Sequence, residues 1–306
     1  MSSASPSIAN SSQRLAFLSV PALALLWGLN WPAVKVMLSV WSPWAVRGIG
    51  LGCGALILLA FAFYRGQPLM LPRASRWRVL VSALLTVVLF NLCVAFAQTQ
   101  GSTSRAAIVT FVMPIWTVLL AWPILGEKPT RTTLIAMGLA LCGLALLGLP
   151  LLTSGASLIG VVLALLAGFS WAAGTVFVKR FPLGVAPLVA ASWQLGLGAA
   201  VATLGWGLCQ IGNLPTPATP ADQLWLQDWF WLALPYHAVM SSALAYLIWF
   251  DVITKLPATV AAMGSLLIPM VGVGSAMGLL GERPSVTDLG GFAFISAAAA
   301  LTLIKR

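Results

Sequence analysis

The chain alternates between long apolar blocks and short breaks that hold charged residues, proline or glycine. Each block approaches the roughly 20 apolar residues that an α-helix needs to cross the hydrocarbon core of a membrane. The blocks are longer than the strands of a lipid-facing barrel and lack their alternation. The pattern predicts an all-α integral membrane protein with ten transmembrane helices, at residues 15–38, 43–64, 77–98, 103–125, 131–149, 157–179, 186–210, 229–254, 258–280 and 286–304.

The composition excludes several other classes of protein. Of the 306 residues, 60% are hydrophobic and only 7% are charged, and the mean hydropathy is +0.99. A soluble domain carries about a quarter charged residues, so this chain could not cover a water-facing surface. The net charge of +10 comes from residues scattered between the apolar blocks, not from a basic stripe that binds nucleic acid. We expect the lipid bilayer as a partner, and no nucleic acid.

The basic residues predict the orientation, because cytoplasmic loops of membrane proteins collect lysine and arginine. With the N-terminus inside, twelve of the sixteen lie at cytoplasmic ends: Arg14, Arg65, Arg73, Arg76, Arg78, Lys128, Arg131, Lys179, Arg180, Lys255, Lys305 and Arg306. The opposite side keeps four: Lys35, Arg47, Arg105 and Arg283. Both termini are therefore expected in the cytoplasm, and the Ser-rich residues 1–14 are expected to be disordered.

The sequence also resembles itself. Residues 125–129 read Leu-Gly-Glu-Lys-Pro and residues 280–284 read Leu-Gly-Glu-Arg-Pro, an offset of 155. The same offset pairs Pro114 with Pro269, and an offset of 144 pairs Trp27 with Trp171. The chain is therefore expected to hold two five-helix repeats, at 15–149 and 150–306. Five is odd, so the second repeat would be inverted, an arrangement typical of secondary transporters.

The segment Trp27-Gly28-Leu29-Asn30-Trp31, the mid-helix prolines and the twin Gly-Glu-Lys/Arg-Pro turns resemble the EamA type of the drug/metabolite transporter superfamily over residues 15–304. The aromatic-rich first and sixth helices are most similar to bacterial exporters of aromatic and other neutral amino acids. This resemblance implies a bacterial inner-membrane location and efflux by alternating access. It also implies ten helices and a central cavity formed mainly by the third, fourth, eighth and ninth.

Polar side chains in the middle of a membrane-spanning helix usually face a cavity or another helix. The offset of 155 pairs Asn91 with Tyr246, near the centres of the third and eighth helices. Two hydrogen-bonding groups at related positions suit the amino or carboxylate group of a substrate. Such residues also join helices to one another in membranes, so both readings stay open.

Further polar candidates for substrate binding are His237, Asn30 and Gln194. His237 is the only histidine and could accept a proton near neutral pH or serve as a hydrogen-bonded packing residue. One histidine without a neighbouring acid cannot form a metal site, so no metal or cofactor is expected. Arg47 could hold a carboxylate, but its position near the outer end of the second helix favours the membrane interface or a helix cap.

Three tryptophans lie away from the helix ends, where an interfacial belt does not explain them. Trp27, Trp116 and Trp171 could form a flat wall against an apolar or aromatic side chain, or could pack the core.

Pro114 and Pro269 interrupt their helices and are candidate gating hinges, or static kinks that shape the cavity. Glu127 and Glu282 are expected to be structural, because each lies in a tight turn close to the start of the next helix.

Deep acidic residues, which proton- or sodium-coupled carriers commonly use, are missing from the helix centres. The leading hypothesis is therefore facilitated efflux of small-molecule substrates, amino acids with aromatic and neutral ones favoured, and no enzymatic activity. The alternatives are an exporter of nucleobases, drugs or other metabolites, then a membrane enzyme on lipid-linked substrates, or a passive channel. The last two lack, respectively, converging catalytic groups and a charged or carbonyl-lined filter.

Overall fold

The computed structural model describes residues 6–153, 157–212, 221–281 and 286–304, and these residues form helices without any strand. The α-helices and the π- and 3₁₀-helical segments (labelled η) are, in chain order, α1 (Pro6–Gly28), α2 (Asn30–Leu38), α3 (Pro43–Tyr64), α4 (Arg73–Ala83), η1 (Leu84–Leu89), α5 (Phe90–Gln98), α6 (Thr103–Thr110), α7 (Met113–Leu125), α8 (Arg131–Thr153), α9 (Leu158–Arg180), α10 (Pro187–Ile211), η2 (Ala221–Trp229), α11 (Phe230–Pro235), η3 (Tyr236–Leu244), α12 (Ala245–Lys255), α13 (Ala258–Gly264), α14 (Leu267–Leu280) and α15 (Val286–Ile304).

Helices cover all ten segments that the hydropathy pattern predicts. Among the described residues, eight helical segments are long and apolar enough to cross a membrane. The fifth and tenth predicted helices, α8 and α15, hold shorter apolar stretches, at Arg131–Leu146 and Leu289–Ala298. The chain is a multi-pass membrane protein, and membrane crossing by α8 and α15 stays a prediction.

The start of the chain differs from the expectation of disorder over residues 1–14. Helix α1 begins at Pro6, within that segment. Proline suits the first turn of a helix because its fixed φ is helical and its missing N–H would have no partner there. The polar residues that follow extend the apolar helix towards its N-terminus.

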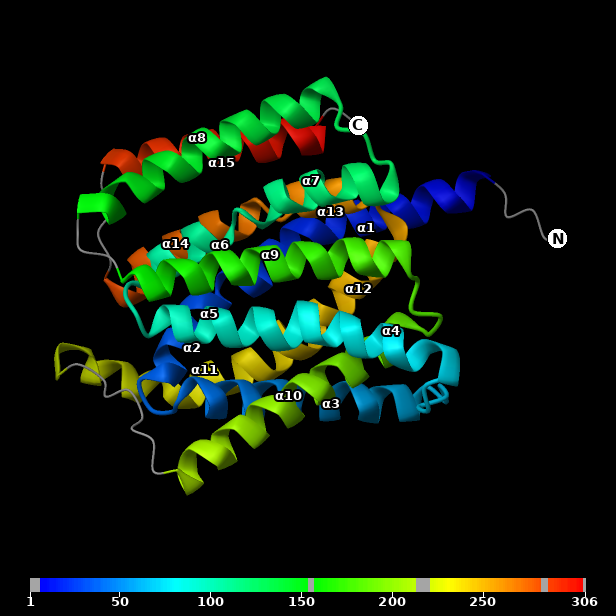
Figure 1. The fold of residues 1–306 in the computed structure, drawn as a ribbon, viewed down its shortest axis with the longest axis horizontal. Helices are drawn as coiled ribbons and strands as arrows, with labels where there is room; N and C mark the ends of the chain where they lie inside the picture. The colour runs from blue at the N-terminus through cyan, green and yellow to red at the C-terminus, as the bar shows by residue number, and fades with distance from the viewer. Residues whose placement is uncertain (1–5, 154–156, 213–220, 282–285, 305–306) are drawn as a thin grey trace.

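The helices run along the long axis of one bundle (Figure 1). Helix α3 packs against α10, and α8 packs against α15 at one side of the bundle. Helix α9 lies centrally, against α5 and α7, while α1 packs against α12 and α14. The start of α1 and the end of α15 lie at the same end of the bundle (Figure 1).

Three of the membrane-crossing segments are broken near the bundle centre. Helix α1 gives way to α2 at Leu29, α6 gives way to α7 at residues 111–112, and α13 gives way to α14 at residues 265–266. Pro114 and Pro269 lie in the first turns of α7 and α14, where proline is tolerated because those N–H groups lack intrahelical partners. Each proline therefore follows a break in its membrane-crossing helix. A hinge movement about these breaks remains a prediction.

Two π-helical segments, η1 and η3, interrupt the third and eighth predicted helices. Adding the repeat offset of 155 to η1 gives residues 239–244, which end η3. A π-helical turn widens the helix and leaves main-chain carbonyls available to other partners. Such segments are frequent at functional sites, and here each one precedes a polar residue near the centre of the bundle.

The two Leu-Gly-Glu-Lys/Arg-Pro stretches include matching glycines at the ends of α7 and α14. Gly126 and Gly281 both have φ +71°, the left-handed conformation that closes a helix and favours glycine. Glu282 lies outside the described residues. Glu127 was expected to have a structural role near the start of α8, but the helix start that its carboxylate contacts is that of α13. Its carboxylate accepts hydrogen bonds from the N–H groups of Ala258 and Thr259 at 3.1 and 3.0 Å, and from the Thr259 hydroxyl at 2.9 Å.

Replacing Glu127 with alanine should lower thermal stability, because the first N–H groups of α13 lose a charged acceptor. The expected cost is about 1–2 kcal/mol, the usual range for loss of a helix cap. The measurement is the apparent melting temperature of the detergent-solubilised protein. Glu127→Gln should fall between the wild type and Glu127→Ala, and Lys128→Gln, at an exposed neighbour, is the control. Equal melting temperatures for Glu127→Ala and wild type would contradict the capping role.

Candidate functional site

A cavity lies where the broken helices and the π-helical segments meet. The empty space between its lining side chains is about 540 Å³, a volume that includes space open to solvent. Its lining residues come from both halves of the chain: Trp27, Asn30, Trp31, Arg47, Phe90, Asn91, Val94, Gln98, Phe111, Met113, Trp171, His237, Ser241, Ser242, Tyr246 and Ile268. The third, fourth, eighth and ninth predicted helices contribute, as the resemblance implied, and the first, second and sixth contribute as well.

Aromatic rings form one wall of the cavity. The rings of Trp27 and Trp171 meet edge to face, with centroids 5.3 Å apart, and Tyr246 lies 5.5 Å from Trp27. Phe90 packs on Trp171 at 4.6 Å, and Trp249 supports both tryptophans from behind at 5.8 and 5.2 Å. Tilted and edge-to-face contacts of this kind hold large side chains rigidly, so the wall is preorganised.

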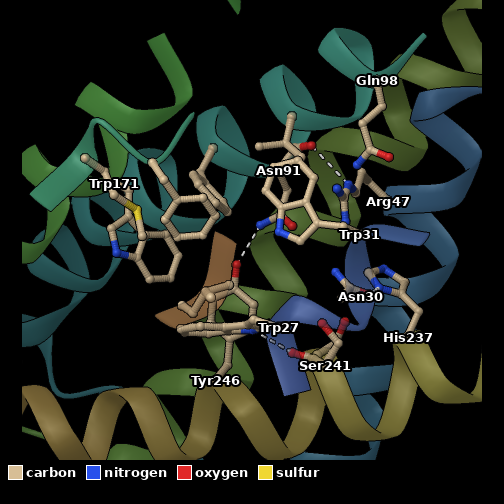
Figure 2. A pocket seen from close by; sticks show the side chains of 16 residues that line it. Trp27, Asn30, Trp31, Arg47, Asn91, Gln98, Trp171, His237, Ser241 and Tyr246 are labelled. Atoms are coloured by element: carbon tan, nitrogen blue, oxygen red, sulfur yellow. Dashed lines mark hydrogen bonds between the residues drawn. The ribbon is translucent and has the colours of Figure 1, made fainter. Parts of the chain in front are cut away.

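Asn91 joins the two halves of the chain across the cavity. Its Nδ2 donates to the hydroxyl oxygen of Tyr246 at 2.6 Å and to the main-chain oxygen of Val87 in η1 at 2.9 Å. The two repeat-related residues that the sequence analysis paired are therefore in direct contact. They act as one polar unit at the edge of the aromatic wall (Figure 2).

The opposite side of the cavity holds most of its polar side chains, with Trp31 beside Arg47 (Figure 2). Arg47 and Gln98 lie together at one end, and His237 and Asn30 lie beside each other further along (Figure 2). The Nδ1 of His237 lies 2.8 Å from the Oδ1 of Asn30. Arg47 is only 1% exposed, and its Nε donates to the main-chain oxygen of Asn91 at 3.0 Å.

The π-helical segments help to build the site by supplying carbonyl groups. The indole Nε1 of Trp27 donates to the main-chain oxygen of Ser241 in η3 at 3.1 Å. In the other half, the Ser170 hydroxyl of α9 donates to the main-chain oxygen of Leu85 in η1 at 2.6 Å. Each widened turn is thus satisfied by a side chain from the opposite half of the chain, which fixes the cavity walls relative to each other.

Of the candidates taken from the sequence, Trp27, Asn30, Asn91, Trp171, His237 and Tyr246 line the cavity. Gln194 and Trp116 do not. Gln194 is fully buried between α10 and the third predicted helix, where its Oε1 accepts hydrogen bonds from Ser82 at 2.8 Å and Thr86 at 3.2 Å. Trp116 stacks edge to face on Phe169 at 5.6 Å.

Gln98 and Trp31 also line the cavity and were not predicted, and Arg47 lines it although the membrane interface or a helix cap was preferred for it over a carboxylate-binding role. The assignment of Arg47 to the membrane interface was wrong, because its side chain turns inward and is buried. The sequence did hold a signal for Arg47: a charged residue inside a membrane-spanning helix is energetically costly, and such residues usually serve a function. The prediction for Arg47 relied on its closeness to the end of the helix, and this criterion was misleading. An arginine side chain at this position is long enough to extend either outwards to the membrane interface or inwards to the cavity.

The hydrogen bond between Asn91 and Tyr246 makes a specific prediction about stability. Asn91→Ala and Tyr246→Phe should be non-additive, with a coupling of about 0.6–1.7 kcal/mol, as found for hydrogen bonds between membrane helices. Unfolding of the wild type, both single variants and the double variant measures it. Thr117→Ala combined with Tyr246→Phe is the control and should be additive, because Thr117 bonds Met113 within its own helix. An additive Asn91/Tyr246 cycle would contradict the contact.

An all-helical bundle of membrane-crossing segments around a cavity with one aromatic and one polar wall is the architecture of a membrane transporter. The family model described as the EamA-like transporter family matches two stretches of the chain, residues 14–149 and 158–304. The chain belongs to the EamA-like transporter family.

Three relatives carry the name of a transporter or an efflux pump. The chain is 28% identical to the "uncharacterized transporter YvbV" of Bacillus subtilis, over 92% of this chain and 90% of that protein. It is 26% identical to the "uncharacterized inner membrane transporter YedA" of Escherichia coli K12, over 86% and 82%. A "probable amino-acid metabolite efflux pump" of Salmonella typhimurium is 27% identical over 90% of each chain.

A solved crystal structure of another protein has the same fold. It matches with a TM-score of 0.71, covering 94% of this chain and 96% of that one, at 21% sequence identity. The likeness supports the arrangement of the helices and carries no information about substrate.

Proposed function

We propose that this protein exports amino acids or closely related metabolites, with aromatic and other neutral ones favoured. The observation that carries the proposal is the division of the cavity into an aromatic wall and a polar wall. A zwitterionic molecule with an apolar side chain matches both walls at once. The name of the Salmonella relative, a probable amino-acid metabolite efflux pump, agrees with this substrate class.

We further propose transport by alternating access between two inverted five-helix repeats, ten transmembrane helices in all. Several related features support this reading: the matching glycine turns, the π-helical segments at the repeat offset, and the breaks before Pro114 and Pro269. The helix contacts are also reciprocal, since α1 packs on α12 and α9 packs on α5 and η1. Near-equivalent halves favour two packings of similar energy, one open to each side.

The orientation we propose has both termini in the cytoplasm of a bacterial cell, with the protein in the inner membrane. The start of α1, the start of α4 and the end of α9 lie at one end of the bundle (Figure 1). Basic residues lie at each of these helix ends, as is usual for the cytoplasmic ends of membrane helices: Arg14, Arg73, Arg76, Lys179 and Arg180. The name of the Escherichia coli relative, an inner membrane transporter, agrees with the location. Arg47 and Gln98 then lie towards the outer end of the cavity.

The test is the flux of labelled L-phenylalanine into proteoliposomes, compared with protein-free liposomes. Saturable flux that unlabelled neutral amino acids suppress is the expected result. No flux from folded protein would overturn the amino-acid assignment. Imposed proton and sodium gradients test the energy source, and flux that either gradient drives uphill would contradict facilitated transport.

A further inference from the structure

Arg47 carries a positive charge into the interior of the bundle. It lies in α3, which is long and apolar enough to cross a membrane, and its side chain is 1% exposed. Among the described residues, its Nε bonds the Asn91 oxygen and its buried Nη1 has no hydrogen-bond partner. A buried guanidinium with an unused donor is costly, because an unpaired charge loses its hydration without compensation.

The residues that line the cavity contain no carboxylate to balance this charge. The titratable side chains that share the cavity with Arg47 are His237 and Tyr246, which bond Asn30 and Asn91 respectively. Two acids of the described part have partners elsewhere, since Glu127 binds the start of α13 and Asp251 pairs with Lys255 at 2.6 Å. An anionic group that balances the charge of Arg47 would therefore have to come from a molecule bound in the cavity.

The surroundings of Arg47 define what this counter-ion is. The Gln98 side chain lies beside the guanidinium (Figure 2), and a second cation is close, since the Nζ of Lys35 lies 3.5 Å from the main-chain oxygen of Gln98. A planar guanidinium binds a planar carboxylate through parallel N–H donors. The aromatic wall of Trp27, Trp171 and Tyr246 begins beyond Asn91, so the anionic group must be attached to an apolar body.

We propose that Arg47 is the binding residue for a substrate carboxylate, and that the cavity selects monocarboxylates carrying an aromatic or large apolar group. The carboxylate lies at the Arg47–Gln98 end and the apolar body lies against the aromatic wall. The inference rests on the proposed function for its identification of the carboxylate as that of a transported amino acid. It adds that the carboxylate, and not the amino group, is the required feature. Amines of the same shape are rejected, because they place a second positive charge beside Arg47.

Three probes of one shape test this on the wild-type protein: L-phenylalanine, 3-phenylpropionate (carboxylate only) and 2-phenylethylamine (amine only). Each is added to the detergent-solubilised protein and to the flux assay as a competitor. 3-Phenylpropionate should raise the melting temperature and compete with labelled phenylalanine, and 2-phenylethylamine should do neither. Equal effects of the amine and the carboxylate, or no stabilisation by 3-phenylpropionate, would overturn the inference.

Variants then assign the effect to the residue. Arg47→Gln should weaken 3-phenylpropionate binding more than tenfold, and Arg47→Lys should keep part of it. Arg78→Gln is the matched control, because that arginine is partly buried, does not line the cavity, and donates a hydrogen bond to the main-chain oxygen of Pro182 at 2.8 Å. Unaltered binding by folded Arg47→Gln overturns the proposal. If Arg47→Gln does not fold, the comparison of the three probes on the wild type decides.

The two proposals fail separately. Arg47-dependent stabilisation by 3-phenylpropionate, without flux of any amino acid, would uphold the carboxylate site and overturn the proposed function. Saturable phenylalanine flux that 2-phenylethylamine inhibits as well as 3-phenylpropionate would uphold the function and overturn the carboxylate site.

Discussion

Trp171→Ala is expected to abolish transport of bulky substrates while leaving measurable transport of small ones. Trp171 is 3% exposed and contacts Trp27, Phe90, Tyr246 and Trp249. Removing it takes away the centre of the aromatic wall, and the stability cost is about 3–5 kcal/mol, as for large buried side chains elsewhere. The measurement is the flux of labelled tryptophan and, separately, of labelled alanine into proteoliposomes, together with the melting temperature.

Trp116→Ala is the matched control, because it removes the same side chain from a partly exposed position outside the cavity. Trp116→Ala should leave the ratio of the transport rates of large and small substrates unchanged. If Trp171→Ala lowers transport of all sizes equally, and Trp116→Ala does the same, the aromatic wall has a general packing role and does not select substrates.

Gly168→Ala is expected to destabilise the bundle where α9 crosses the break between α6 and α7. A Cβ at Gly168 would lie 2.6 Å from the main-chain oxygen of Thr110 and 3.5 Å from the nitrogen of Met113. A main-chain oxygen cannot turn aside as a side chain can, so the two helices must separate. Overpacking of this kind costs about 1–3 kcal/mol. The melting temperature and the phenylalanine flux should both fall.

Gly138→Ala is the control for the same substitution in an exposed helix position. A Cβ at Gly138 in α8 meets nothing within 4 Å. Alanine favours the helix over glycine by up to about 1 kcal/mol, so this variant should match or exceed the wild type in stability. A Gly168→Ala protein as stable and active as Gly138→Ala would show that α9 is not closely seated on the α6–α7 break.

The helical segments and the family were predictable because they depend on local properties of the chain. The resemblance to the EamA family is confirmed, and helices cover each of the predicted segments. The glycine turn at Gly126 was readable for the same reason, since only glycine enters the left-handed conformation without strain. The π-helical turns η1 and η3 were not predicted, because no side-chain pattern marks them and their freed carbonyls are satisfied by Ser170 and Trp27 from distant segments.

The cavity was predictable only in part, since it depends on how each helix is rotated about its axis. Nearly every side of these helices is apolar, so hydropathy carries little information about which residue faces inward. Gln194 and Arg47 show the consequence. Hydroxyl groups of the third predicted helix hold Gln194 in a packing interface, whereas the inward face of α3 directs Arg47 to the cavity.

The amino-acid sequence by itself determined that this is a multi-pass helical membrane protein of a known family, because hydropathy, proline and glycine act over short stretches of chain. The tertiary structure decided which side chains share the cavity. Close contacts set those rotations: Gly50 admits the His237 ring, and Gly168 admits the Thr110 carbonyl. Such contacts join residues far apart in the chain, so local pattern does not encode them, and the inward position of Arg47 emerged only with the fold.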